Sequence, residues 1–216
     1  MLINEQKKFI FIHVQKNAGI SIEKILLNGF PDTRTWHGRH GRALDALAEM
    51  ESTVWQQYYS FAFVRNPWER MVSWYAMIEE AKKNLSFFKR LKKKPFRSEL
   101  WNYAIDHSND FESFLEKCTA TIFDLGCHKS FIFNQIDYLT DKNGHVIVDF
   151  IGRFENLAAD TDQVFKTLNL ESVRLPKLNQ GQHSHYSRWY NEKTRQLIEE
   201  RFARDIVQFG YRFEQG

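Results

Sequence analysis

Residues 9–21 read Phe-Ile-Phe-Ile-His-Val-Gln-Lys-Asn-Ala-Gly-Ile-Ser, an apolar run followed by a short polar loop. The run Phe9–Val14 is interrupted only by His13, which is typical of a parallel strand covered on both faces. Apolar residues then recur at helical spacing, which predicts a helix over Ser21–Asn28 that ends at Gly29. A strand, a loop and a helix in this order indicate an α/β fold.

The rest of the chain continues this alternation of strands and helices. A second apolar run, Tyr59–Val64, predicts a second strand, and Tyr138–Ile151 is typical of a hairpin that turns at Asp141–Gly144. Capping residues and apolar spacing predict further helices over Arg42–Glu51, Pro67–Glu80, Ser98–Asp106, Asp110–Lys117, Leu157–Leu168 and Asn191–Phe209. With no internal repeat and no linker, we expect residues 1–216 to form a single domain.

The composition excludes several classes of protein. The 216 residues are 43% hydrophobic and 15% aromatic, which suits one domain with a Phe-rich core rather than a disordered chain. The formal net charge of +3 is too small to indicate nucleic-acid binding. Two cysteines, Cys118 and Cys127, cannot form a disulfide framework; they fit a reducing compartment best, and a single bridge between them stays open.

No sequence feature indicates a membrane protein. No segment approaches the roughly 18 consecutive apolar residues of a membrane span, and Met1–Lys8 lacks the apolar run of a signal peptide. We therefore expect a cytoplasmic protein, unless the sequence is the lumenal part of a chain that is anchored elsewhere. The oligomeric state is left open.

The loop after the first strand has the features of an anion-binding site. The first N–H groups of a helix have no partner within the helix, and the helix dipole is positive there. Lys16 adds a positive charge, Gly19 allows close approach of the backbone, and Ser21 offers a hydroxyl. The loop is not the Walker loop of nucleoside triphosphatases, because Lys16 stands five positions before Ser21 and the first glycine is absent. The alternative is a plain strand-to-helix turn.

The second strand also ends in residues that suit an anion. Asn66 is a predicted helix cap, and Pro67 suits the first helical position. Arg65 stands at the carboxyl end of its strand, where open α/β sheets bind ligands, and Ser73 follows Asn66 by about two helical turns. One interpretation is a phosphate held between Arg65 and Ser73. The other is a well-capped helix whose Arg65 pairs with Glu69.

Together, the two segments resemble the carbohydrate sulfotransferases, a group similar to sulfotransferase family 2 that uses 3′-phosphoadenosine 5′-phosphosulfate (PAPS) as sulfuryl donor. The resemblance rests on Lys16–Ser21 after an apolar strand and on Phe63–Ser73, and it extends to Val148–Leu157 and Asp205–Tyr211. It implies one sulfotransferase domain with a P-loop-NTPase-like central parallel sheet flanked by helices. It also implies that 3′-phosphoadenosine 5′-phosphate (PAP) is the nucleotide product that remains after the sulfuryl group is transferred.

The resemblance implies roles for individual residues. The first loop would bind the 5′-phosphosulfate through Lys16, Asn17, Ala18, Gly19, Ile20 and Ser21, and Arg65 and Ser73 would bind the 3′-phosphate. Asn179 and Ser184, in the polar loop before the last helix, are further donor contacts on this ground alone. Gln15, Asn17 and Ile20 depart from the usual Pro-Lys-Thr-Ala-Gly-Thr-Ser, and the loss of two hydroxyls predicts weaker donor binding than is usual for the family.

Sulfuryl transfer to an alcohol needs a base and a positive group beside the leaving oxygen. Lys16 suits the second task. His37 and His40 lie between the two motifs, where related enzymes that sulfate sugar hydroxyls carry their base. His40, close ahead of the Arg42–Glu51 helix, fits that placement better, and His37 is the alternative. His13 lies in the first strand, and we interpret it as structural.

The acceptor is predicted only by class. We expect a hydroxyl, rather than an amine, of a carbohydrate or similar molecule. Eight basic residues within 82–97 fit either a track for an anionic acceptor or a solvated helix face. His183 and His185 resemble a metal-binding pair, but no nearby acid or cysteine completes a ligand set, so we expect no metal.

Two other functions remain as alternatives. A nucleotide-dependent, kinase-like enzyme on the same kind of sheet would need a Walker loop and a Mg²⁺-binding acid at a strand end, and the sequence offers neither convincingly. A non-catalytic module that binds anionic glycans would depend on the basic residues of 82–97 instead of on Lys16 and His40.

Overall fold

The structure is a computed structural model that describes residues 1–85, 96, 98–120, 130–170 and 185–216. The chain divides into two compact units. The first comprises Met1–Arg65 and Gln135–Gln182, and the second comprises Asn66–Asn134 and His183–Gly216. The single domain expected over residues 1–216 stays a prediction.

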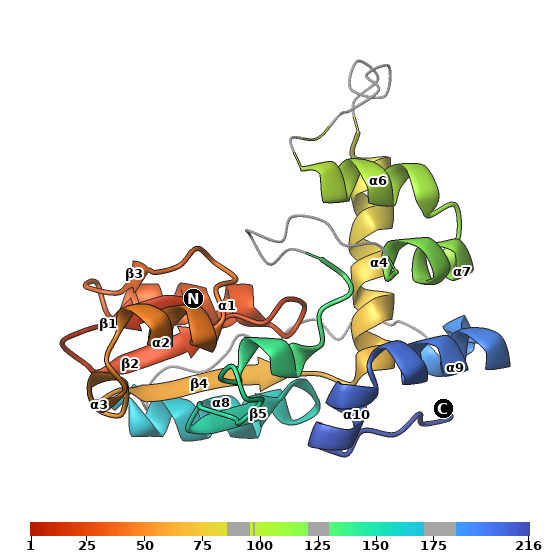
Figure 1. The fold of residues 1–216 in the computed structure, drawn as a ribbon. Coiled ribbons are helices and arrows are strands. Elements are labelled where there is room, and N and C mark those ends of the chain that lie inside the picture. Colours follow the sequence, from red (N-terminus) through yellow and green to blue (C-terminus); the bar gives the residue numbers. More distant parts are fainter. Residues whose placement is uncertain (86–95, 97, 121–129, 171–184) are drawn as a thin grey trace. The chain divides into compact units, whose positions relative to one another are not determined.

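The first unit is built on a five-stranded sheet in the order β3-β1-β2-β4-β5 (Figure 1). The strands are β1 at Leu2–Asn4, β2 at Phe9–Ile12, β3 at Arg34–Thr35, β4 at Tyr59–Val64 and β5 at Phe150–Arg153. β2, β4 and β5 run parallel, with Phe61 of β4 opposite Phe11 and Phe150, whereas β1 pairs antiparallel with β2 and β3. The α/β fold is confirmed. The sheet is mixed rather than parallel throughout, and its likeness to P-loop NTPases stays a prediction.

The antiparallel strand β1 is not predicted by the sequence. Leu2 and Ile3 are both buried, but they lie in a short, mostly polar stretch that offers no periodicity to read. Asn4 is buried as well, and it donates a hydrogen bond to Thr33 Oγ1 (3.0 Å) and accepts one from the Lys7 N–H (2.7 Å). The bond from Lys7 holds the turn that leads from β1 into β2, and the bond to Thr33 links β1 to the segment before β3.

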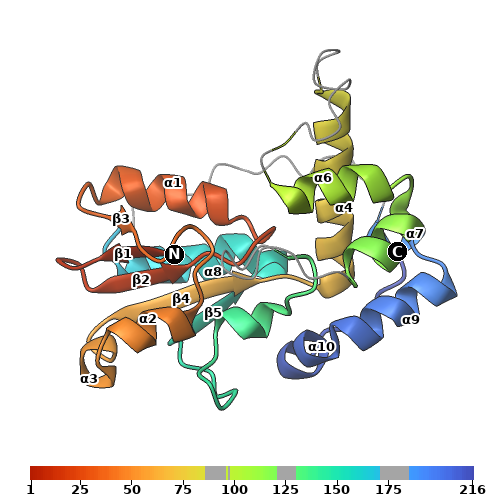
Figure 2. The same cartoon turned by 45° about the horizontal axis from the view of Figure 1, so that its top comes forward.

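Helices flank this sheet and close its core. They are α1 at Gly19–Gly29, α2 at Ala43–Glu49, α3 at Ser52–Trp55 and α8 at Leu157–Thr167, with 3₁₀ turns η3 at Gln135–Tyr138 and η4 at Phe154–Asn156. Figure 2 shows α1 running alongside β1 and β2. Leu26 of α1 and Phe165 of α8 are buried in one apolar cluster with Phe9, Phe11 and Phe61 of the strands. Each such side chain contributes roughly 1.5–3 kcal/mol when it leaves water.

The hairpin predicted over Tyr138–Ile151 is present only in its inner part, where backbone hydrogen bonds join Asp141 to His145 and Leu139 to Ile147. Thr140 and Val146 form one isolated antiparallel bridge around its turn. The following residues do not return along it, because Phe150–Arg153 pairs in parallel with β4. Asp149 guides the chain there: its Oδ2 accepts hydrogen bonds from the N–H and the hydroxyl of Ser60, each over 2.7 Å.

The second unit is helical. Its elements are α4 at Pro67–Lys83, α6 at Glu99–His107, α7 at Phe111–Ser113, a π-helical turn η1 at Phe114–Cys118, a 3₁₀ turn η5 at Tyr186–Trp189, α9 at Glu192–Arg201 and α10 at Ala203–Phe209. The predicted start of α4 is confirmed, since Asn66 Oδ1 accepts from the Trp68 N–H and Pro67 is the first helical residue. The helix predicted over Asp110–Lys117 is present only as α7 followed by η1.

The single helix predicted over Asn191–Phe209 is also wrong, because the chain breaks at Phe202. Asn134 provides the physical reason. Its Nδ2 donates to the Arg201 carbonyl (3.2 Å), and its Oδ1 accepts from the Asp205 N–H (3.2 Å). A side chain from elsewhere in the unit thus satisfies backbone groups on both sides of the break, while Phe202 is fully buried.

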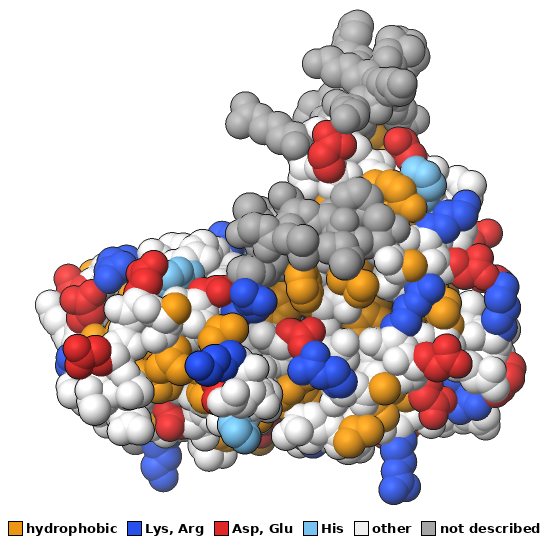
Figure 3. Space-filling view, viewed as in Figure 1, with side chains coloured by type: hydrophobic (Ala, Val, Ile, Leu, Met, Phe, Trp, Pro, Cys, Tyr) orange, Lys and Arg blue, Asp and Glu red, His pale blue; other side chains and the backbone are white. Residues whose placement is uncertain are grey.

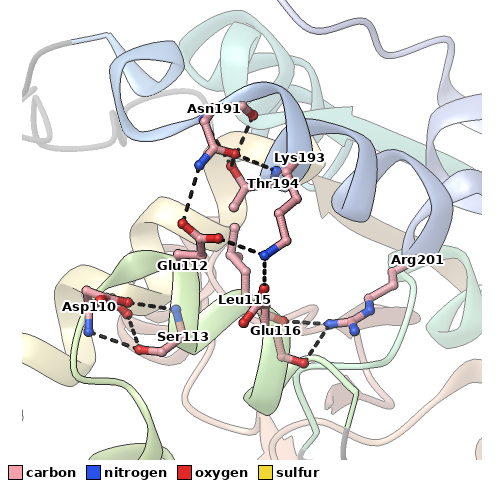
Figure 4. A network of polar contacts seen from close by, with 9 residues as sticks. All are labelled: Asp110, Glu112, Ser113, Leu115, Glu116, Asn191, Lys193, Thr194 and Arg201. Carbon is pink, nitrogen blue, oxygen red and sulfur yellow. Dashed lines mark hydrogen bonds and ion pairs between the residues drawn. The ribbon is translucent and has the colours of Figure 1, made fainter.

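Polar contacts fix α9 to the segment α7–η1 (Figure 4). Lys193 pairs with the carboxylates of Glu112 and Glu116. Arg201 Nη1 donates to the carbonyl of Leu115 over 2.6 Å and to that of Glu116 over 3.2 Å. Exposed ion pairs such as those of Lys193 contribute little, so the arginine, which satisfies backbone carbonyls of the π-helical turn, is the stronger link. None of the described helices is both long and apolar enough to cross a membrane.

Candidate active site

The loop between β2 and α1 presents backbone N–H groups at the edge of the sheet. β2 ends at Ile12, and α1 begins at Gly19, two residues earlier than predicted. Lys16 (φ 71°) and Ala18 (φ 62°) are left-handed, which is costly for non-glycine residues and recurs in backbone turns that bind anions. Ala18 caps α1 without a side-chain hydrogen bond, and its carbonyl accepts from the N–H groups of Ser21 and Ile22. Such a helix start can bind a tetrahedral anion.

Gly19 has a packing role that the sequence did not reveal. A Cβ at this position would lie 2.1 Å from both Cδ2 and Nε2 of His13, so any side chain would displace the imidazole. His13 is buried, as predicted, and its Nδ1–H donates to Glu23 Oε1 over 2.8 Å. Glu23 Oε2 also pairs with Arg39 Nε at 3.2 Å. Burial is the largest influence and raises the pKa of Glu23, yet the hydrogen bond from His13 and the charges of His13 and Arg39 lower it overall.

Arg65 lies beside this loop. Its Nη1 donates to the Lys16 carbonyl over 3.3 Å, and its guanidinium carbon lies 3.8 Å from the centroid of the Phe154 ring. A planar guanidinium stacks well on an aromatic face, so Phe154 and the Lys16 carbonyl both contribute to the placement of the Arg65 guanidinium. The first unit therefore brings Lys16 and Arg65, predicted from separate motifs, to neighbouring strand ends.

Asn17 and Gln135 connect the two motifs inside the unit. Asn17 Nδ2 donates to the Phe63 carbonyl (2.7 Å) and to Gln135 Oε1 (2.8 Å). An amide nitrogen has two hydrogens, so both side-chain donors of Asn17 are used within the protein. Contact between Asn17 and an anion is thus limited to its backbone N–H. Its Oδ1 is buried and meets no hydrogen-bond donor in the part of the chain that the structure describes.

Gln135 is a site residue that the sequence analysis missed. Its Oε1 accepts from the Arg65 N–H and its Nε2 donates to the Arg65 carbonyl, both over 2.8 Å. The only local signal was a polar residue within the mostly apolar stretch Phe131–Leu139, since buried polar groups need partners. Its partners lie far away in the sequence, so that signal alone could not name them.

The two candidate bases differ in their surroundings. His40 Nδ1 lies 3.0 Å from the His13 carbonyl, and since a carbonyl only accepts, Nδ1 carries the proton and Nε2 keeps a lone pair. Burial lowers the pKa of His40 to about 4, so the ring is neutral at pH 7. His37 instead lies near α2, with its Nε2 3.3 Å from Glu49 Oε2. His40 is therefore the histidine attached to the β2–α1 loop.

The remaining predicted residues are less constrained. Ser21 is half-buried in the first turn of α1, and Ile20 is 69% exposed. Ser73 lies on α4 in the second unit, so its pairing with Arg65 stays a prediction. Asn179 and Ser184 lie outside the described residues.

The basic stretch 82–97 and His183 lie largely outside the described residues. Of the eight basic residues within 82–97, only Lys82 and Lys83 are described, and Lys82 pairs with Glu79 at 2.8 Å. On the face seen in Figure 3, basic and acidic side chains are interspersed. His183 lies outside the described residues; within them, no three His, Cys, Asp or Glu side chains are grouped to hold a metal ion.

Of the two cysteines, the structure describes Cys118. Cys118 is buried, and burial raises the pKa of its thiol to about 12. Cys127 lies outside the described residues, so a bridge between the two stays open.

Comparison with known proteins identifies a family. The model described as the sulfotransferase family matches residues 1–212. The chain has no significant match among curated proteins or among solved structures.

Proposed function

Because the chain belongs to the sulfotransferase family, we propose that it transfers a sulfuryl group from PAPS to a hydroxyl of a carbohydrate or similar acceptor. Family membership supports sulfuryl transfer as the chemistry. The donor, the acceptor class and the base are proposed from the site. One observation carries the proposal: Arg65 lies against the loop that contains Lys16, with Nη1 3.3 Å from the Lys16 carbonyl.

PAPS has anionic groups at both its 5′ and 3′ positions and therefore needs two cationic anchors. We assign the 5′-phosphosulfate to the N–H groups at the start of α1, to Lys16 and to the Ser21 hydroxyl. We assign the 3′-phosphate to Arg65, with Ser73 as a second ligand. Charge-assisted hydrogen bonds of this kind are roughly twice as strong as neutral ones, so the two anchors would dominate donor affinity.

The reaction needs one proton acceptor. The acceptor oxygen forms a bond to sulfur while the bond between sulfur and the 5′-phosphate oxygen breaks, and the hydroxyl proton passes to Nε2 of His40. Lys16 and the loop N–H groups balance the charge that develops on the leaving oxygen. His37 is the alternative base.

The low pKa of His40 has a consequence for this role. A base with a pKa of about 4 is fully deprotonated at pH 7 but weak. A bound polyanion favours the charged form of a nearby imidazole. Donor binding should therefore raise the pKa of His40 towards neutrality and strengthen the base when the substrate is present.

The test is ligand binding followed by transfer. PAP should raise the melting temperature of the protein, whereas ATP with Mg²⁺ should leave it unchanged. Transfer of labelled sulfate from PAPS across a panel of glycans, lipids and small alcohols then identifies the acceptor. Stabilisation by ATP with Mg²⁺ but not by PAP would overturn the proposal in favour of a kinase-like enzyme.

A further inference from the structure

We infer that Gln135 is a positioning residue that aligns the Arg65 guanidinium for the 3′-phosphate of the donor. This inference rests on the proposed function, because it concerns the same donor site. Gln135 itself is fully buried and reaches no ligand directly. It acts through the backbone of Arg65 and through the side chain of Asn17.

Arg65 lies where the sheet no longer holds the chain. The pairing of β4 with β2 reaches Ala62 opposite Ile12, and its pairing with β5 ends at Val64 opposite Arg153. Arg65 is thus the first residue beyond the end of β4. A backbone released from a ladder samples several φ/ψ combinations, and each would direct the long arginine side chain elsewhere.

The Gln135 side chain holds the backbone of Arg65 beyond the end of β4. Its amide makes two antiparallel hydrogen bonds with Arg65, accepting from the N–H and donating to the carbonyl, each over 2.8 Å. In an antiparallel ladder, the N–H and the carbonyl of the facing residue would form the same pair of hydrogen bonds. Arg65 is thus held as though β4 were one residue longer, and its guanidinium reaches the Phe154 ring and the Lys16 carbonyl.

The same amide oxygen also holds the first loop. Gln135 Oε1 accepts a second hydrogen bond, from Asn17 Nδ2 over 2.8 Å. One buried side chain in η3 therefore contacts both the residue that carries the cationic anchor and the loop that starts α1. The Asn17 side-chain amide therefore bonds within the protein, where it fixes the loop relative to Arg65.

The experiment measures how well the protein recognises the 3′-phosphate. Dissociation constants for PAP and for adenosine 5′-phosphate, which lacks that phosphate, are measured by calorimetry below the melting temperature. The ratio of the dissociation constant for adenosine 5′-phosphate to that for PAP reports the contribution of the 3′-phosphate. Gln135→Met keeps the size of the side chain and removes its hydrogen bonds, and we expect the ratio to fall roughly 10-fold. Gln163→Met, at an exposed position of α8, is the matched control and should leave the ratio unchanged.

A second background separates positioning from a purely structural role. Arg65→Ala keeps the backbone groups that Gln135 binds but removes the guanidinium. In that background Gln135→Met should still lower the melting temperature, yet it should not lower the ratio further. Should Gln135→Met fail to fold, Gln135→Asn keeps the amide but is one methylene too short for both bonds, and it should lower the ratio as well.

The outcomes are distinct. If Gln135→Met or Gln135→Asn has the same ratio as the wild type, the inference is overturned and the proposed function is unaffected. A further fall of the ratio in the Arg65→Ala background also overturns it, because Gln135 would then act independently of the guanidinium. A wild-type protein that does not bind PAP, or binds it no better than adenosine 5′-phosphate, overturns the proposed function and the inference together.

Discussion

Arg65 Nη1 donates a hydrogen bond to the Lys16 carbonyl over 3.3 Å. The two residues are 49 positions apart, and each follows one strand of the parallel pair β2 and β4. Parallel strands bring their carboxyl ends to one edge of a sheet, where α/β proteins bind ligands. In the proposed function, Lys16 and Arg65 are the two separate anchors for a donor that is anionic at both ends.

Removal of the Arg65 guanidinium should weaken recognition of the 3′-phosphate. We expect Arg65→Ala to bind PAP roughly 10- to 100-fold more weakly and to bind adenosine 5′-phosphate almost as the wild type does, because one charge-assisted contact is lost. Calorimetric titration measures both. Arg34→Ala, which removes an exposed arginine paired with Glu5, is the control. An equal loss for both nucleotides would contradict a specific role of Arg65 at the 3′-phosphate.

Replacement of His40 should affect turnover rather than donor binding. We expect His40→Ala to lower turnover by roughly 10²–10⁴-fold, the usual contribution of general acid–base catalysis. PAP affinity should stay within about twofold of wild type. His37→Ala is the matched control, since His37 is paired with Glu49 near α2. If His37→Ala abolishes turnover and His40→Ala does not, the base has been assigned to the wrong histidine.

The pKa of His40 makes stability depend on pH. Burial lowers it to about 4 in the folded protein, against 6.5 for an ordinary histidine. Between these values the unfolded chain binds a proton that the folded protein does not. Folding stability should therefore be complete above about pH 6.5 and fall as the pH drops towards 4.

Two measurements check this pH dependence. Histidine resonances of the free protein, assigned with His40→Gln, should show one ring that titrates near pH 4. Urea unfolding from pH 7 to pH 4.5 should lose less stability in His40→Gln than in the wild type, because that variant has no imidazole to protonate. A His40 resonance that titrates near 6.5 would show that the ring is not desolvated.

A side chain at position 19 should destabilise the first unit. The Cβ of Gly19→Ala would overlap the His13 imidazole, and overpacking of this kind costs about 1–3 kcal/mol of unfolding free energy. Urea denaturation measures the loss. Gly29→Ala, at the other end of α1, meets only terminal atoms of Leu170 at 3.0 Å and should cost much less. In a His13→Ala background the effect of Gly19→Ala should largely disappear; a persistent loss there would mean that His13 is not the obstacle.

Local sequence signals were sufficient for most elements of the fold. Strands formed at Phe9–Ile12, within the predicted run Phe9–Val14, and at Tyr59–Val64 because each stretch is mainly apolar, and α4 starts at Pro67 because Asn66 caps it. These strands and this helix start depend on residues that are close together in the sequence, so local patterns can predict them. β1 and the break at Phe202 could not be predicted, since the first depends on pairing with distant strands and the second on the side chain of Asn134.

The sequence by itself determined the residue types at the candidate site: a lysine and a helix start after one strand, and an arginine after the next. Only the tertiary structure decided how they are held. Gln135 bonds to Asn17, which is 118 positions away in the sequence. Burial lowers the pKa of His40 to about 4. The His13 imidazole fills the space that a side chain at position 19 would need. Burial and long-range hydrogen bonds are properties of the folded chain, so no local pattern encodes them.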